Sequence, residues 1–309
     1  MERSFKDYAI ISLKGMAMGA ADVVPGVSGG TIAFISGIYE ELIDSINKVN
    51  LKSLKLLRDE GLKAFWKEVN ANFLLALLIG IGISVVSFAK LIRHLLENQP
   101  VLIWSFFFGL VLASIIYVAK KISRWYVGTV VMLIAGCLIA YFITTLSPQE
   151  AVVTYPFVFL SGALAICAMI LPGISGSFIL LLLGMYKPVL DAIHFKDFGL
   201  IAVLMAGAVV GLLSFSRLLK WLFDHYENLT LAVLTGFIIG SLNKIWPWKH
   251  VLESEVINGK VKILKEESVL PLSFDGDPQL GWAVLLGIAG FAFILLLERL
   301  ADKKIKVDA

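Results

Sequence analysis

Two apolar stretches of this 309-residue chain are interrupted by nearly the same glycine-rich sequence, PGVSGG at residues 25–30 and PGISGS at residues 172–177. Proline and glycine end helices, and non-helical backbone leaves N–H and C=O groups that need partners. At membrane depth such backbone is tolerated only where protein or a water-filled cavity surrounds it. The two motifs therefore predict two broken, re-entrant segments that are buried inside the molecule.

The composition places those segments in a membrane. Hydrophobic residues make up 58% of the chain and charged residues only 17%, with a mean hydropathy of +0.85, whereas soluble domains carry about 25% charged residues. The alternation of apolar and polar positions that a membrane barrel needs is absent. Apolar runs long enough to cross a bilayer as helix predict spans near 72–96, 101–119, 126–146, 198–222, 229–245 and 280–298. We expect an all-α polytopic membrane protein.

The sequence is duplicated. Residues 23–46 align with residues 170–193 at a constant offset of 147, and nine of the 24 positions are identical. The match resumes at an offset of 127, where SFAKLIRHLL (87–96) aligns with SFSRLLKWLF (214–223). We therefore expect one membrane domain, 1–309, made of repeat 1 (about 1–147) and repeat 2 (about 151–300). Each repeat is predicted to be a re-entrant helical hairpin followed by three transmembrane helices.

The orientation of the repeats follows from the number of crossings. A unit with a re-entrant hairpin crosses three times, so the second copy is inverted; a hairpin that crossed fully would make the copies parallel. Basic residues favour the inverted arrangement, because 3–6, 48–67, 120–124, 217–220 and 303–306 then fall on the cytoplasmic side, with both termini. On the opposite side, the loop at 144–156 has no base and the longer loop at 246–279 has mixed charges, while Lys90 and Arg93 are exceptions. The Lys- and Leu-rich segment 47–68 is typical of an amphipathic helix on the cytoplasmic membrane surface, although a solvated linker helix has the same pattern.

Each break is followed by the start of a short helix, whose free N–H groups and positive dipole end favour an anion. Glycines let the backbone approach closely, and hydroxyls supply further donors. The alternative is that these small residues only permit tight helix packing. The candidate anion-binding residues of the motifs are Gly26, Ser28, Gly29, Gly30, Thr31, Gly173, Ser175, Gly176 and Ser177.

Three charged residues within apolar segments are further candidates. Asp22 precedes the first motif and aligns with Met169, so it is the asymmetric element; it either couples transport to a proton or sodium gradient or pairs with a cation to hold the loop. Lys90 and Arg217 occupy the same repeat position and suit phosphate recognition. In inverted copies they would lie on opposite sides of the midplane and could pass an anionic head group between them. Snorkelling at the ends of spans is the alternative.

Other chemistry is not indicated. The chain has no G-x-x-x-x-G-K-[ST] motif for ATP, and its histidines are scattered near span ends, outside any metal-ligand spacing. We expect no catalytic residues, no cofactor, no metal site and no nucleic-acid partner.

Two segments carry a family resemblance: GMAMGAADVVPGVSGGTIAFISGIYEELI (15–43) and LPGISGSFILLLLGMY (171–186). They resemble a bacterial membrane family formerly labelled as a domain of unknown function and now regarded as polyprenyl-phosphate transporters. The likeness covers essentially the whole chain. It implies that the partner is a polyprenyl-phosphate lipid, and that the protein flips undecaprenyl phosphate from the outer to the cytoplasmic leaflet of the bacterial cytoplasmic membrane, which recycles this carrier for cell-envelope synthesis.

Two rival functions are weighed against that expectation. One is a secondary transporter of a small anion or ion with the same inverted-repeat architecture. The other is a membrane lipid phosphatase, which would need His94 or His225 within hydrogen-bond reach of a motif serine.

Overall fold

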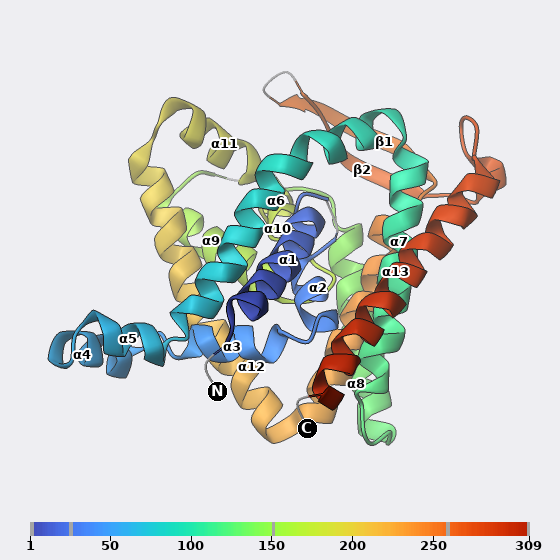
Figure 1. Ribbon diagram of the computed structural model, residues 1–309. Coiled ribbons are helices and arrows are strands. Elements are labelled where there is room, and N and C mark those ends of the chain that lie inside the picture. Colours follow the sequence, from blue (N-terminus) through green and yellow to red (C-terminus); the bar gives the residue numbers. More distant parts are fainter. Residues whose placement is uncertain (1–2, 25–26, 150–151, 258–259, 308–309) are drawn as a thin grey trace.

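The computed structural model describes residues 3–24, 27–149, 152–257 and 260–307. Most of them lie in helices that pack side by side, and a short two-stranded hairpin lies at one end (Figure 1). The elements are α1 (Phe5–Asp22), α2 (Gly29–Ile35), α3 (Tyr39–Asn47), α4 (Leu51–Asp59), α5 (Leu62–Glu68), α6 (Ala71–Asn98), α7 (Pro100–Lys120), α8 (Val127–Thr145), α9 (Tyr155–Ile170), α10 (Gly176–Leu182), α11 (Tyr186–Phe195), α12 (Phe198–Ser241), the 3₁₀ turn η1 (Leu242–Ile245), β1 (Lys249–Ile257), β2 (Lys260–Ser268), η2 (Pro271–Ser273) and α13 (Leu280–Val307).

Within the described residues, four helices are long and apolar enough to cross a membrane: α6, α7, α8 and α12. The 44 residues of α12 would extend about 66 Å as one straight helix, roughly twice the hydrocarbon thickness. Its backbone is non-helical at Tyr226 (φ −139°, ψ 42°). In Figure 1, α12 turns back near the end of the molecule that holds both termini. The two legs of α12 correspond to the spans predicted at 198–222 and 229–245. The prediction of a polytopic helical membrane protein is confirmed.

Each motif lies in a segment of three helices, α1–α2–α3 and α9–α10–α11. In both segments the two short helices are separated by a glycine with positive φ, Gly37 at +70° and Gly184 at +68°, a conformation that side chains with a Cβ rarely adopt. The bend between α10 and α11 is 105°. In Figure 1, α3 lies near the end of the molecule that holds both termini, and α11 lies near the opposite end.

Equivalent helices of the two halves make equivalent contacts. α1 packs on α6, and α9 packs on the first leg of α12. A Cβ on Gly80 would collide with the carbonyl of Ser12, and a Cβ on Gly207 would collide with that of Phe159. Gly207 and Phe159 are the residues that align with Gly80 and Ser12 at the two sequence offsets, so both halves share one close helix crossing.

The third long helix of each half packs against the other half. α13 packs on α7, and α8 packs on the second leg of α12. The close approaches again correspond. A Cβ on Gly109 would collide with the carbonyl of Gly287, and a Cβ on Gly236, which aligns with Gly109, would collide with the carbonyl of Leu133. The halves are therefore interlocked and do not form two separate bundles.

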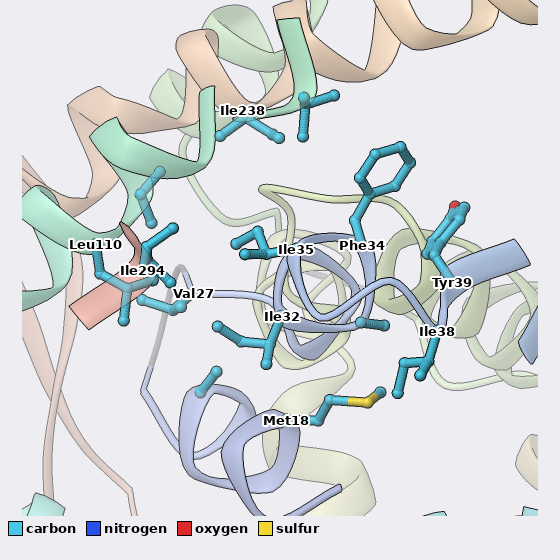
Figure 2. Close-up of a cluster of buried hydrophobic side chains, with 14 of the residues drawn as sticks. Met18, Val27, Ile32, Phe34, Ile35, Ile38, Tyr39, Leu110, Ile238 and Ile294 are labelled. Carbon is cyan, nitrogen blue, oxygen red and sulfur yellow. The ribbon is translucent and has the colours of Figure 1, made fainter. Parts of the chain in front are cut away.

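The first short helix, α2, lies in the centre of the main apolar core. All seven of its residues are buried. Figure 2 shows Ile32, Phe34 and Ile35 of α2 among side chains from α1, α7, α12 and α13. Protein thus surrounds the interrupted backbone, as the membrane setting demands.

Two surface segments differ from the sequence-based expectation. The stretch 246–279, predicted as a loop, contains the antiparallel hairpin β1–β2. The predicted amphipathic helix at 47–68 is two short helices, α4 and α5, because Gly61 adopts φ +85° and ends the first. Apolar side chains on this pair are exposed, Leu51 to 83% and Leu62 to 64%, and the pair projects from the bundle (Figure 1).

Candidate functional site

The two motif segments meet inside the bundle. The Ser28 hydroxyl lies 3.2 Å from the Met169 carbonyl oxygen and 3.1 Å from that of Leu171, and it donates to these acceptors. In the opposite direction, the Gly173 N–H donates to Thr31 Oγ1 over 3.1 Å. Ser28 and Thr31 are each only 1% exposed. Their hydroxyls therefore hold one segment to the other in this arrangement.

The start of α2 is occupied by groups of the chain itself. The Gly29 N–H donates to Asp22 Oδ1 over 2.7 Å, and the Gly30 N–H donates to Ser28 Oγ over 3.1 Å. An Asp or Ser that accepts these N–H groups is the usual N-terminal cap of a helix. Of the roles weighed for Asp22, the structure shows a loop-holding one, although the partner is backbone and not a cation. Gly26 lies outside the described residues.

Lys14, within the apolar part of α1, is a charged residue whose role sequence reasoning missed. Its ammonium donates to the Ser36 carbonyl over 2.6 Å, and Ser36 directly follows α2. α1 therefore places a carboxylate at the N-terminal end of α2 and an ammonium at its C-terminal end, where each suits the helix dipole. The available signal was a lysine eight positions before Asp22 within an apolar stretch.

The second motif is more open than the first. The hydroxyls of Ser175 and Ser177 lie 2.9 Å apart and share a hydrogen bond. Ser175 is 7% exposed, but Gly176 is half-buried and Ser177 is exposed. Gly173 has φ +92°, and a Cβ there would come within 3.0 Å of the Phe237 carbonyl oxygen on the second leg of α12. Hydroxyls of the second motif are thus the more accessible donors.

The two predicted cations, Lys90 on α6 and Arg217 on α12, are exposed. No hydrogen bond or ion pair of the described residues joins either of them to the motifs. Close to Arg217, two contacts join the end of α3 to α12. Asn47 Nδ2 donates to the Ser216 carbonyl over 2.9 Å, and Lys220 Nζ lies 2.8 Å from Asp44 Oδ1. The pairing of Lys90 and Arg217 with the motifs stays a prediction.

A charged cluster under the hairpin was also missed. Glu266 Oε1 accepts from Lys244 Nζ at 2.8 Å and from Lys249 Nζ at 2.7 Å, and all three side chains are at most 17% exposed. Burial lowers the pKa of Lys249 to about 8 against the opposing effect of Glu266. Burial alone would raise the pKa of Glu266, but the two lysines hold it below its ordinary value.

This cluster borders the second motif. The Lys244 ammonium lies 4.8 Å from the ring centroid of Phe178, the residue that follows Ser177. Two ammonium groups share one carboxylate, so the cluster carries a net positive charge beside the start of α10. Only the fold brings it together, because its members lie on η1, β1 and β2.

The histidines weighed for catalysis make local contacts. His94 Nδ1 lies 3.0 Å from Asn98 Nδ2, and His225 Nδ1 lies 2.9 Å from the Trp221 carbonyl oxygen. In the part of the chain that the structure describes, neither histidine is hydrogen-bonded to a motif serine. The same part brings together no group of three His, Cys, Asp or Glu side chains that could hold a metal ion.

Comparison with known proteins gives a family and two named relatives. Residues 18–263 match a family model described as undecaprenyl phosphate translocase-like. The chain is 47% identical over 303 residues to a "Polyprenyl-phosphate transporter" of Vibrio cholerae serotype O1, covering 96% of this chain and 98% of that protein. It is 32% identical over 257 residues to a "Polyprenyl-phosphate transporter" of Staphylococcus aureus, covering 76% of this chain and 85% of that protein. No solved structure matches.

Proposed function

We propose that this chain, which belongs to the undecaprenyl phosphate translocase-like family, moves undecaprenyl phosphate between the leaflets of the bacterial cytoplasmic membrane. The observation that carries the proposal is the meeting of the two motif segments inside an apolar bundle, joined by Ser28 and Thr31. Polar, non-helical backbone at that depth marks the substrate sites of many secondary transporters. The polyprenyl tail is compatible with lipid, so only the charged head group needs the protein's shelter.

An inverted repeat gives such a site access from both leaflets. The equivalent glycine contacts of the two halves and the matching conformations of Gly37 and Gly184 support the duplication. The positions of α3 and α11 near opposite ends of the molecule support the inversion (Figure 1). Both termini and the basic pair α4–α5 lie toward one end, which we assign to the cytoplasm because lysine and arginine favour that side.

The phosphate is proposed to contact the second motif first, because Gly176 and Ser177 are accessible there. Lys90 and Arg217 would receive the head group on the two sides of the midplane. The hydroxyls and N–H groups of the first motif would join once the segments separate, since their present partners are Met169, Leu171 and Asp22. Release of Gly29 by the Asp22 carboxylate is the step that a proton or sodium gradient would drive. This activity recycles the lipid carrier and involves no covalent step on the chain.

Leaflet exchange in proteoliposomes tests the proposal. Purified protein is reconstituted with labelled undecaprenyl phosphate, and the head group exposed on the outer face is measured over time. The double variant Lys90→Ala/Arg217→Ala is expected to slow exchange by about tenfold or more, because each cation contributes a charge-assisted hydrogen bond. The control Lys52→Ala/Arg58→Ala removes the same charges from α4 and should leave exchange unchanged.

Two results would count against the proposal. If the wild-type protein does not accelerate exchange over protein-free liposomes, the proposed transport function is refuted. If exchange is unchanged in the Lys90→Ala/Arg217→Ala variant, the role assigned to these two cations is refuted while the function stands.

A further inference from the structure

An apolar cavity of about 410 Å³ opens between the two legs of α12. The first leg supplies one wall, the second leg supplies the other, and α8 contributes Met132. The residues that line it, called the α12 groove below, are Met132, Leu171, Phe215, Leu219, Leu222, Tyr226, Leu229, Thr230, Val233, Leu234 and Phe237. Its size falls within the range of small-molecule sites, which is roughly 300–1,000 Å³.

The lining admits an apolar occupant. Thr230 is one of the lining residues, and its hydroxyl is already used, because it donates to the Tyr226 carbonyl over 3.0 Å. The charged side chains of this part of α12 are not among the lining residues: Arg217, Lys220 and Asp224 are absent from the groove wall. A phosphate group would find no described counter-charge there, whereas a hydrocarbon chain meets only matching surface.

The groove reaches the second motif. Leu171 lines it, directly precedes Pro172, and accepts the Ser28 hydroxyl on its carbonyl at 3.1 Å. Phe237 lines it too, and the carbonyl of Phe237 lies against Gly173. One end of the groove is therefore the place where the two motif segments meet, and the kink at Tyr226 lies at the other.

We propose that the α12 groove binds the head-proximal isoprene units of the polyprenyl chain while the phosphate is held at the motifs. The inference rests on the proposed function and adds a site for the tail. In a polyprenyl phosphate the chain is bonded directly to the phosphate, so a head group at the motifs fixes the first isoprene units within a few bonds of Leu171. A glycerophospholipid instead separates its phosphate from its acyl chains by a glycerol.

The groove contributes to binding by orienting the isoprene units. It adds little hydrophobic free energy, because bilayer lipid is as apolar as the groove wall. Holding the first units in one direction reduces the freedom that the head group must lose on binding. The remainder of a long polyprenyl chain stays in the membrane, reached through the open side between the α12 legs.

Filling the groove tests the inference. Val233→Trp places an indole in it, and Val209→Trp places the same side chain at an exposed position of α12 (50% exposed). Both variants and the wild type are assayed for leaflet exchange of undecaprenyl phosphate, and for inhibition of that exchange by methyl phosphate, which has no isoprene unit. We expect Val233→Trp to slow exchange by about tenfold relative to Val209→Trp, while the concentration of methyl phosphate that inhibits exchange by half stays the same. Unchanged exchange in Val233→Trp, or an equal loss of sensitivity to methyl phosphate, overturns the inference.

A second measurement does not depend on how the variant folds. Wild-type protein in liposomes is irradiated with a polyprenyl phosphate that carries a photoreactive diazirine on its second isoprene unit, and the labelled peptides are identified. We expect labels on the residues of the α12 groove. Excess undecaprenyl phosphate should prevent this labelling, whereas excess phospholipid or neutral polyprenol should not. Labels elsewhere, or labels that phospholipid removes equally well, show an ordinary lipid contact and overturn the inference. Failure of wild-type exchange is a separate result, which removes the proposed function itself.

Discussion

Thr31 and Gly173, one from each glycine-rich motif, are joined by a 3.1 Å hydrogen bond across 142 positions of sequence. The donor is the backbone N–H of Gly173, and the acceptor is the threonine hydroxyl oxygen. The contact is buried, because Thr31 is 1% exposed. Together with the bonds of Ser28, it makes the two motifs a single polar centre within an apolar bundle.

Ser28→Ala is expected to destabilise the protein, and Ser177→Ala is its matched control. The first change removes an acceptor from the buried Gly30 N–H and a donor from two carbonyls, at a cost of about 1–3 kcal/mol per unsatisfied group. Ser177 is exposed, so its loss should leave the thermal midpoint in detergent nearly unchanged while it slows lipid exchange. Equal midpoints for the two variants would contradict this assignment.

Asp22 allows its capping role to be separated from a coupling role. Asp22→Ala deletes the acceptor of the Gly29 N–H and should lower stability by about 1 kcal/mol, whereas Asp22→Asn retains an acceptor and should be close to wild type. If the carboxylate charge couples transport to an ion gradient, Asp22→Asn loses the response of lipid exchange to an imposed proton or sodium gradient. A full response in the asparagine variant argues against coupling at this residue.

Gly80→Ala and Gly82→Ala differ only in their surroundings on α6. A Cβ at Gly80 meets the backbone of Ser12, while nothing lies within 4 Å of one at Gly82. The first variant should lose about 1–3 kcal/mol through overpacking, and the second should be neutral or slightly stabilised because alanine favours helix. Gly207→Ala should behave like Gly80→Ala. Thermal unfolding of the three purified variants measures this, and a similar loss for Gly82→Ala would rule out the crossing as the cause.

Lys249 predicts a pH dependence outside the membrane-spanning helices. Its pKa falls from 10.5 to about 8 on folding, chiefly through burial, so between these values the unfolded chain binds a proton that the folded chain has released. Stability from this group therefore rises with pH from about 8 to 10.5. Relative to Lys249→Met, which cannot titrate, the wild type should gain on the order of 2 kcal/mol between pH 7 and pH 10. A constant difference between the two midpoints across that range would refute the assignment.

Local sequence patterns predict much of this fold. The spans, the two interruptions and the duplication follow from apolar runs and from the recurrence of the motif. The kink at Tyr226 falls between two predicted spans, although no proline in α12 marks its position. The hairpin was missed because its strands are polar and lie in a stretch that the membrane argument leaves unconstrained.

The interactions of the site are harder to predict. Ser28 and Thr31 were expected to face an anion, whereas the structure shows them bonded to the other motif segment. Partners more than a hundred positions apart leave no mark in local spacing. Lys14 and Ser36 are 22 positions apart, and Glu266 lies 22 and 17 positions from Lys244 and Lys249. No local motif joins these residues, and they meet only after the chain has folded.

The exchange of α8 and α13 between the halves has a consequence for how the chain is made. α8 leaves the ribosome before the second leg of α12, on which it packs. α7 likewise has no partner until α13 is made, near the end of synthesis. The first half thus enters the bilayer with two helices that lack their neighbours. Cutting the gene between the repeats should therefore give fragments that accumulate only when both are expressed together.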